Sequence, residues 1–510
     1  MSAEQEYVLA NDILPNISID VINQIVSKTW SDSTNLVLAA MLPQKEGVNY
    51  PTTDSLRQVL HAVEAEDIRP YEDTSDLPPL ISHQPKAGKI KKREPAAYGY
   101  TKLTLQNGVQ VYLKHTDYNK DEVQMNAFSE GGTSLYEDSE SLNLLMAMEV
   151  AQVGGYGNFS QSDLKKSLAG KQVSLTPVLS YYDEELIGSS TPKDVETMLQ
   201  LTYLCFTDIR KDAEAFQSWK QRTYATKINQ EQEPLVAFQD TLLANLYNHH
   251  PRVRNLKAQW VDSIDYDRCL EIVRERFSNA ADFSFVITGA YDETTIERHI
   301  EQYLGSLPTS KKREHYRNIN LELATGAQQV VFNRSMEVPM SSIYYIQNGT
   351  QPYDMRYQIA SKLIADILGI VYTEEIREKE GGTYFVVSHI EQIPWPISTC
   401  LAQTFYQTNP ERYEYLNSKI DSIQSDFAHN GPSETNLNKV RASMLKEHYQ
   451  SLTENTYWSN QMVQLLLYGV NLHDGYEEML NSLTTSDLRL IYNELIDQQN
   501  MLKIIMIGEK

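Results

Sequence analysis

The chain has 510 residues, a formal net charge of −23 and a pI near 4.9. This length predicts two to four domains, and 41% hydrophobic with 10% aromatic residues is enough for ordinary cores, which argues against intrinsic disorder. The acidic balance argues against nucleic acid or an anionic membrane as the main partner, because both select basic surfaces.

Neither cysteine chemistry nor a membrane span is predicted. Cys205, Cys269 and Cys400 are widely separated and odd in number, so they form neither a disulfide framework nor a metal knuckle. No apolar run approaches the roughly 18 residues of a transmembrane helix. The N-terminus lacks the basic and apolar regions of a signal peptide. That last absence carries little weight, because we expect residue 1 not to be the natural start.

A helix–break–strand passage occurs three times along the chain. Each copy has a Ser/Thr/Asp helix start, an amphipathic helix, a polar break and an apolar strand. In the first copy the break is Asp32–Asn35 and the strand is Leu36–Leu42. The helices and strands of the three copies are 17–26 with 36–42, 262–273 with 283–289, and 483–492 with 501–508. The alternative is a generic αβ ending that recurs by chance.

The spacing of the repeat gives the length of its unit. The strands that begin at 283 and 501 start 218 residues apart, whereas the first copy's strand begins at 36. We therefore expect a fragment that holds the tail of one unit and two whole units. The predicted divisions are a tail at 1–71, a proline-rich basic linker at 72–98, a first complete unit at 99–310 and a second at 311–510.

Within the first unit, residues 103–113 read as a hairpin with an Asn107-Gly108 turn. A strand at 123–129, a helix from about Ser139 and long helices at 193–210 and 211–230 follow. The second unit repeats this order with strands at 328–333 and 341–347 and a helix from about Tyr353. The fold class is therefore α+β: tandem units, each a mostly antiparallel sheet backed by long helices.

These elements resemble the insulinase/pitrilysin family, the M16 zinc metallopeptidases. The residues that carry the resemblance are the Asn107–Val109 hairpin, Phe128–Thr133, the strand ending at Val286–Gly289 and, above all, Arg377-Glu-Lys-Glu-Gly-Gly-Thr-Tyr384. The resemblance covers essentially the whole chain. It is strongest for bacterial members with four homologous units, of which this chain corresponds to the second half and the tail of unit two.

The family's zinc motif, His-x-x-Glu-His, is absent from this chain. The eleven histidines form neither that motif nor His-Glu-x-x-His. Aliphatic residues and Met occupy the matching helix at 141–150, where Glu149 alone cannot hold a metal, and the helix around Lys362–Asp366 also lacks histidine. His249-His250 reads as a loop pair that is solvated or capping rather than metal-binding. Both whole units are predicted to be zinc-less, and the resemblance places zinc on a missing N-terminal half.

Other catalytic motifs are absent from the sequence as well. It contains no Gly-x-Ser-x-Gly elbow, no Walker loop and no Gly-x-Gly-x-x-Gly after a strand. The run Gly154-Gly155-Tyr-Gly157 follows a helix and reads as a helix stop and turn.

Arg377 and Tyr384 are the candidate substrate-binding residues. Gly381-Gly382 is expected to end a helix and fold back a strand that alternates from Thr383, which makes the two side chains neighbours. The resemblance implies that such a pair approaches the substrate backbone and stabilises the tetrahedral intermediate. The alternative is a solvated arginine at a helix end and a strand tyrosine on a polar face. The strand continuing through 387–391 is a candidate edge for pairing with an extended peptide.

The resemblance implies that the chain is the non-catalytic half of an M16 zinc metalloendopeptidase, inactive alone, which closes the chamber and binds peptide. The implied partners are the N-terminal catalytic half of the same polypeptide and unfolded peptide substrates. A periplasmic or cell-envelope location is inferred from the family alone. The alternative function is a structural or binding protein with the M16 fold and no peptidase activity.

Overall fold

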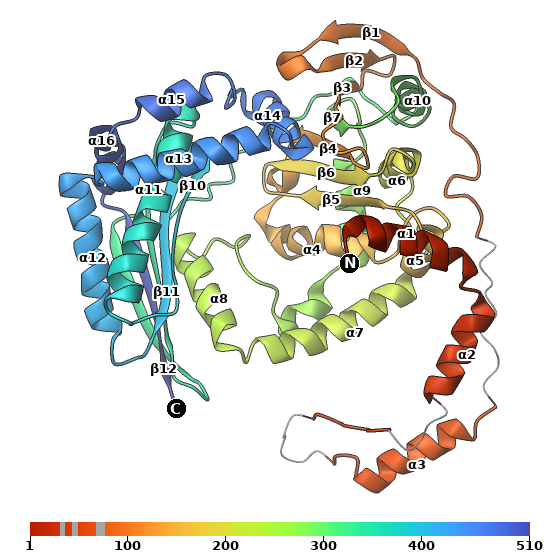
Figure 1. Ribbon diagram of the computed structural model, residues 1–510, viewed down its shortest axis with the longest axis horizontal. Coiled ribbons are helices and arrows are strands. Elements are labelled where there is room, and N and C mark those ends of the chain that lie inside the picture. Colours follow the sequence, from red (N-terminus) through yellow and green to blue (C-terminus); the bar gives the residue numbers. More distant parts are fainter. Residues whose placement is uncertain (31–35, 43–48, 68–76) are drawn as a thin grey trace. The chain divides into compact units, whose positions relative to one another are not determined.

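The computed structural model describes residues 1–30, 36–42, 49–67 and 77–510. The chain forms two compact units, Met1–Thr74 and Ser75–Lys510, each of which is described by itself (Figure 1). Among the described residues, no helix is both long and apolar enough to cross a membrane.

The unit Met1–Thr74 is helical in its described parts. Side chains that accept a hydrogen bond from the first helical turn begin two of its helices, with Ser2 before α1 and Thr52 before α3. Its elements are α1 (Ala3–Ile13), η1 (Leu14–Asn16), α2 (Ile19–Trp30) and α3 (Thr53–Glu64). Helix α2 confirms the first predicted helix.

The strand predicted at Leu36–Leu42 is wrong for the described residues of this unit. Residues 36–42 form no ladder and are exposed. An apolar segment becomes a strand only where a neighbouring strand accepts its backbone hydrogen bonds, and the described part of this unit contains no strand to do so. The polar break predicted at Asp32–Asn35 lies outside the described residues.

The first sheet of the unit Ser75–Lys510 has seven strands in the order β1-β2-β3-β7-β4-β6-β5. Strands β3 and β7 are parallel, and every other neighbouring pair is antiparallel. The predicted Asn-Gly turn joins β2 to β3, with Gly108 at a positive φ of 93°. The strands are β1 (Ile90–Pro95), β2 (Thr101–Leu105), β3 (Gln110–His115), β4 (Val123–Glu130), β5 (Val173–Leu179), β6 (Asp183–Ser190) and β7 (Ser284–Gly289).

Helices cover one face of this sheet and enclose a core that includes Val111, Met125, Phe285 and Ile287. The predicted helices near 139, 193–210 and 211–230 are confirmed as α4, α6 and α7. The α-helices are α4 (Ser141–Gln152), α5 (Gln161–Ser167), α6 (Val195–Thr207), α7 (Ala213–Gln230), α8 (Pro234–Leu246), α9 (Tyr266–Arg276) and α10 (Glu293–His299). Shorter turns are η3 (Ala97–Gly99), η4 (Gly132–Leu135), η5 (Asp138–Glu140), η6 (Ala258–Ser263) and η7 (Ile300–Leu304).

The second sheet has five strands in the order β10-β11-β9-β12-β8. Its strands are β8 (Ala327–Ser335), β9 (Ser341–Thr350), β10 (Val386–Ile393), β11 (Thr399–Thr408) and β12 (Met501–Glu509). Its helices are α11 (Met355–Tyr372), η8 (Thr373–Glu378), α12 (Tyr413–Asn430), α13 (Glu434–Ser451), α14 (Asn455–Tyr468), α15 (Tyr476–Ser482) and α16 (Thr485–Ile496). The predicted helix–strand endings at 262–289 and 483–508 are confirmed as α9–β7 and α16–β12.

The two sheets share one topology. Strands β3, β7, β4, β6 and β5 follow the same order and relative directions as β8, β12, β9, β11 and β10. We call the part built around the first sheet the first repeat and the part built around the second sheet the second repeat. Mixed helices and mostly antiparallel sheets confirm the α+β class. The residue boundaries predicted for the units stay a prediction.

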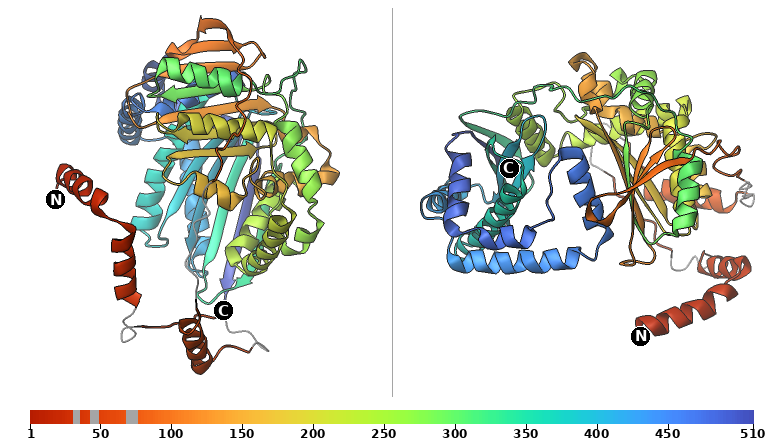
Figure 2. Two further views of the ribbon diagram at one scale, coloured as in Figure 1. Left: turned by 90° about the vertical axis from the view of Figure 1, so that its right-hand side faces the viewer. Right: turned by 90° about the horizontal axis from the view of Figure 1, so that it is seen from above.

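The two repeats exchange helices. Helix α14 of the second repeat packs on β4 and β7 of the first sheet, and α8 of the first repeat packs on β12 of the second sheet (Figure 1). The long helix α13 runs from the second repeat toward the first, as the view from above shows (Figure 2). Each exchanged helix buries apolar side chains, such as Met462 of α14 beside Phe128 and Phe238 of α8 beside Ile504. Helices of its own repeat therefore cover one face of each sheet, and a helix of the other repeat packs on the opposite face.

Part of the predicted linker 72–98 is regular structure. Residues 72–76 lie outside the described residues, but Ile90–Pro95 forms strand β1, paired with β2. A basic side chain of this segment is paired with an acid, since Arg93 forms an ion pair with Glu297. The backbone N–H of Ile90 also donates to Glu301 Oε1 at 2.9 Å. These contacts attach the segment to the edge of the first sheet.

Candidate functional site

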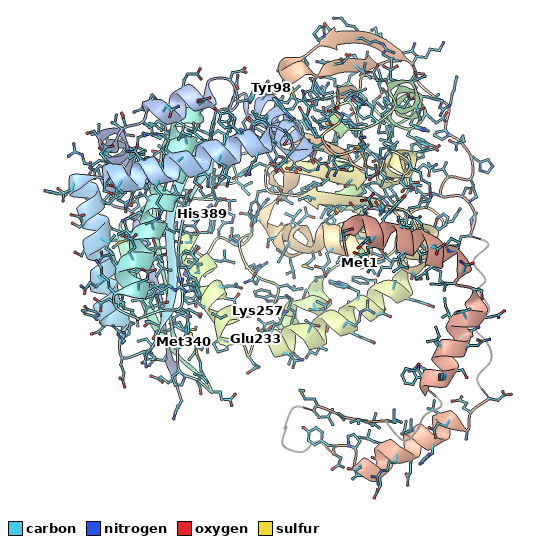
Figure 3. All side chains as sticks on the ribbon, in the orientation of Figure 1. Met1, Tyr98, Glu233, Lys257, Met340 and His389 are labelled. Carbon is cyan, nitrogen blue, oxygen red and sulfur yellow. The ribbon has the colours of Figure 1, made fainter. Side chains whose placement is uncertain are left out.

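Strand β10 is an open edge of the second sheet. It pairs on one side with β11, from Val386 opposite Tyr406 to Ile393 opposite Thr399, and it stands last in the strand order. Its side chains alternate between half-buried and exposed, with Val387, His389 and Glu391 on the exposed face. Figure 3 labels His389 on this strand. An edge of this kind presents unpaired backbone donors and acceptors to an added strand.

A groove of about 380 Å³ lies between this edge strand and helix α11. Helix α11 contributes Gln358, Lys362 and Asp366, and β10 contributes Ser388, His389 and Ile390. The helical residues recur at the spacing of one face, which is how a single helix lines a groove along its length. Tyr457 and Gln461 of α14 and Tyr476 of α15 close the other side.

Polar side chains give this groove hydrogen-bonding capacity. Gln358 Nε2 donates to Gln392 Oε1 at 2.9 Å, and Lys362 Nζ forms an ion pair with Asp366 Oδ2 at 3.0 Å. Gln461 Oε1 is buried and has no hydrogen-bond partner among the described residues. A buried acceptor without a donor is unfavourable by about 1–3 kcal/mol. This oxygen is enclosed by the protein, so the polar groups available in the groove are those of Gln358, Lys362 and Asp366.

The first repeat has a smaller cavity at the matching place, between α4 and β5. Its volume is about 260 Å³, and its lining includes Leu144, Leu145, Leu179, Tyr181 and Arg252. A strand added beside β5 would meet Pro177, which lacks a backbone donor and protects a sheet edge. The edge of β10 contains no proline from Val386 to Ile393.

Neither helix offers a ligand set that fits a zinc ion. On α4, Glu149 Oε1 accepts a hydrogen bond from Trp219 Nε1 at 2.9 Å, while its neighbours are aliphatic. On α11 the matching positions hold the Lys362–Asp366 ion pair. Throughout the described ranges, no group of three or more His, Cys, Asp or Glu side chains is placed to hold a metal ion. A catalytic zinc needs about three such ligands.

Gly381 and Gly382 end a helix, as predicted. Helix α11 continues into η8, whose last turn contains Arg377. The N–H of Gly381 donates to Arg377 O at 3.1 Å, the N–H of Gly382 donates to Ile376 O at 3.4 Å, and Gly381 has a φ of +57°. A glycine in the left-handed region is the usual way to close a helix end and satisfy its last carbonyls.

The strand after these glycines begins later than the sequence analysis expected. Strand β10 starts at Val386 and not at Thr383, because Thr383 Oγ1 donates to Gln407 O at 2.6 Å and holds a turn. Tyr384 lies in this turn with 88% of its side chain exposed. Arg377 is also exposed. No hydrogen bond, ion pair or ring contact joins the two side chains in the part of the chain that the structure describes, so their pairing stays a prediction.

The other residues that the sequence analysis named lie in a loop, at a close backbone approach or in the core. His249-His250 lies in a loop, as predicted, with His249 at a φ of 58° and His250 Nε2 at 3.2 Å from Ile319 O. Gly132 packs so closely that a Cβ would lie 2.6 Å from Asp183 N, and its N–H donates to Glu184 Oε2 at 2.7 Å. The three cysteines are free and buried.

Two features were not predicted from the sequence: a buried acid of the first repeat and the polar residues of α11 that line the groove. Glu184 is 2% exposed, and burial raises the pKa of its carboxyl to about 8. Nothing in the local sequence distinguishes it from Glu185, because the burial depends on η4 and α9 packing from elsewhere. The groove residues of α11 had a usable signal, since polar Gln358, Lys362 and Asp366 recur every four residues in a helix that is mostly apolar.

Comparison with known proteins supports the M16 assignment. Residues 263–444 match the family model described as the peptidase M16 inactive domain. A zinc protease PQQL-like protein of Arabidopsis thaliana is 23% identical over 491 residues, which covers 90% of this chain and 47% of that protein. The chain thus spans about half the length of the curated relatives it matches.

Solved structures share the fold. The periplasmic protease PqqL from Escherichia coli superposes with a TM-score of 0.73 at 18% identity, covering 100% of this chain and 56% of that one. The peptidase M16 inactive domain from Pseudomonas fluorescens gives a TM-score of 0.63 at 17% identity, covering 81% of this chain and 98% of that one.

Proposed function

We propose that this chain is the non-catalytic, zinc-less half of an M16 zinc metalloendopeptidase, which closes the chamber and binds peptide substrate. The observation that carries the proposal is the open edge of β10 beside the groove of about 380 Å³. An extended peptide added to this edge gains backbone hydrogen bonds that do not depend on its sequence, while the groove contacts alternate side chains. That combination suits an enzyme that takes unfolded peptides.

Peptides with blocked backbone N–H groups test the strand-addition mode. Only alternate residues of an added strand donate to the edge. Two extended peptides, N-methylated at odd or at even positions, should therefore differ in affinity by at least about tenfold, which corresponds to about 1.4 kcal/mol. Isothermal titration against the unmethylated peptide provides the measurement. Equal affinity of the two methylated peptides contradicts the mode, because side-chain binding alone does not distinguish the two registers.

The catalytic partner in this proposal is an N-terminal half of the same polypeptide that carries zinc. Metal analysis of the purified chain is expected to give far less than one zinc per molecule, and one zinc per molecule contradicts the assignment of the zinc to the other half. Joining the two halves is expected to give peptide hydrolysis. This chain alone and buffer alone are the controls, and neither is expected to hydrolyse the peptide.

Arg377 and Tyr384 are proposed as substrate contacts in the assembled enzyme. Both are exposed on the segment that leads into β10, so both are free to meet a ligand. A guanidinium donates several hydrogen bonds and a phenol donates one, which suits a developing oxyanion. For the whole protein we propose a periplasmic or cell-envelope location, supported by the periplasmic relative.

A further inference from the structure

A second cavity lies where the two repeats meet. Its volume is about 410 Å³. The turn between β5 and β6 supplies Tyr181 and Tyr182, and Asp183 begins β6. The segment between β10 and β11 supplies Trp395 and Ile397. Ile393, the last residue of β10, also lines it. The cavity is therefore at the end of the same open edge that forms the candidate peptide site.

Four aromatic residues line this cavity, Tyr181, Tyr182, Tyr247 and Trp395, and the rings of Tyr182 and Trp395 belong to a series of packed rings that continues beyond the lining. Tyr182 and Tyr316 are 5.4 Å apart between ring centroids, Tyr316 and Trp395 are 4.8 Å apart, and Trp395 and Tyr468 are 4.8 Å apart. The series crosses from the first repeat to the second, which places these rings in both parts. Ring faces of tyrosine and tryptophan attract cations through their quadrupoles.

Asp183, an acid that forms no ion pair in the described ranges, lies at the same cavity, where the Ser180 side chain is within hydrogen-bonding reach of its carboxyl. Asp183 Oδ1 is buried and has no hydrogen-bond partner among the described residues. Glu185 lies two positions along β6 on the same face, and neither acid forms an ion pair in the described ranges. Burial raises the pKa of Asp183, and burial with the neighbouring Asp183 charge raises the pKa of Glu185 to about 7.

The lining supplies no positive charge to balance these acids. None of the described residues that line the cavity is lysine, arginine or histidine, whereas Glu322 adds another acid. A buried, unpaired carboxylate is unfavourable until a cation approaches it. Two neighbouring carboxylates do not make up the ligand set of a metal ion, and the described chain has no three-residue cluster there. An organic cation would balance this charge without needing the ligand set of a metal ion.

We propose that this junction cavity, defined by Asp183, Tyr181, Tyr182 and Trp395, binds the side chain of an arginine or lysine in a bound peptide. The inference rests on the proposed peptide-binding function and adds a substrate preference to it. The aliphatic stem packs against Ile393 and Ile397, the charged head lies over the aromatic rings, and Asp183 accepts its hydrogen bonds. A guanidinium fits best, because its plane stacks on aromatic faces.

A pair of probes that differ only in charge tests the site. N-acetyl-arginine amide and N-acetyl-citrulline amide have nearly the same shape, but only the first is cationic. Calorimetric titration of the wild-type chain should give a dissociation constant at least about tenfold lower for the arginine probe. The preference should disappear in Asp183→Asn and persist in Asp117→Asn, a matched change at an exposed acid outside the cavity.

The wild-type comparison decides the inference even if Asp183→Asn folds poorly. Equal affinity for the two probes, or no saturable binding of the arginine probe, overturns the cation site. Quenching of tryptophan fluorescence by the arginine probe, reduced in Trp395→Phe, supports its location, and unchanged quenching in that variant overturns it.

A second experiment distinguishes failure of the cation site from failure of the proposed strand addition. An extended peptide ending in arginine amide is compared with its citrulline counterpart and with its N-methylated forms. Sensitivity to N-methylation without a charge preference retains strand addition and overturns the cation site. A charge preference without sensitivity to N-methylation retains the cation site and contradicts strand addition.

Discussion

The two repeats have the same strand order but protect their sheet edges differently. In the first sheet, β2 and β1 cover β3, and Pro177 interrupts the opposite edge at β5. In the second sheet, the matching strands β8 and β10 are both open in the described chain. Open edges are usually blunted because they recruit other strands. The second repeat therefore has a sheet edge suited to an added strand, and the first repeat does not.

The cavities beside the two edges also differ: the cavity of the second repeat is larger and its lining is more polar. In the first repeat, leucines and Arg252 line the cavity between α4 and β5. In the second, the groove between α11 and β10 is larger and includes Lys362, Asp366 and His389. Neither cavity has the ligand set of a zinc site. The first repeat therefore acts mainly as packed structure in our proposal, whereas the second repeat contacts the peptide.

The largest expected effect comes from breaking the helix exchange that joins the repeats. Phe238 of α8 is 3% exposed and packs in the cluster on the face of the second sheet that is directed toward the first repeat. Phe238→Ala is expected to lower the free energy of unfolding by about 3–5 kcal/mol, because it removes apolar burial and leaves a cavity. Hydrogen exchange should show lost protection in β9, β11 and β12 as well as in α8.

The same helix provides the control for this prediction. Leu235 is 47% exposed, so Leu235→Ala should change the free energy of unfolding by no more than about 0.5 kcal/mol. If Phe238→Ala destabilises only α8 and leaves the second sheet protected, the repeats are less coupled than their exchanged helices indicate.

The next effect concerns activity in a protein that joins this chain to a catalytic half. Arg377→Ala or Tyr384→Phe is expected to lower kcat by roughly 10²–10³, the usual result of removing one donor to an oxyanion. Lys379→Ala is the matched control, since Lys379 lies on the same segment and forms an ion pair with Glu375. Unchanged turnover in both Arg377 and Tyr384 variants would favour the alternative of a solvated arginine and a surface tyrosine.

A smaller effect should follow pH through a buried acid of the first repeat. Burial raises the pKa of Glu184 from 4.5 to about 8, so the folded state holds this proton more tightly than the unfolded state. Its contribution to stability is complete below pH 4.5 and is lost as the pH rises to about 8. Each unit of pKa shift corresponds to about 1.4 kcal/mol.

Glu184→Gln removes this titration, because the amide stays neutral while its oxygen can still accept from Gly132. The Tm of the wild type should therefore fall more steeply than that of Glu184→Gln between about pH 5 and pH 8. Glu337→Gln, at an exposed acid of the second repeat, should follow the wild-type curve. Parallel curves for all three proteins would contradict a raised pKa at Glu184.

The sequence was sufficient for the regular elements and for the repeat. Helical spacing and apolar runs are local properties, so α9–β7 and α16–β12 followed from them directly. Local pattern failed at Leu36–Leu42, whose strand needs a pairing partner that the described part of its unit lacks. Within the predicted linker 72–98, local pattern did not reveal strand β1 at Ile90–Pro95, because that strand depends on pairing with β2 and on contacts with Glu297 and Glu301.

The site was less predictable because it depends on distant contacts. The glycines at 381–382 identified the helix end, since φ > 0 is a local requirement. The start of β10 moved to Val386 because Thr383 bonds Gln407, a residue from another strand. Asp183 and Trp395 are far apart in sequence and meet only where the repeats pack. No local spacing brings such residues together, so their cavity required the structure.

The smallest expected effect tests whether the face of β8 that carries Val331 is open in solution. Val331 on β8 is 46% exposed, so Val331→Lys should change the free energy of unfolding by no more than about 0.5 kcal/mol. Val111→Lys, on the covered strand β3, should prevent folding because it buries an unpaired charge. Urea unfolding measures both variants. A loss above about 1.5 kcal/mol in Val331→Lys would mean that this face of β8 is covered in solution.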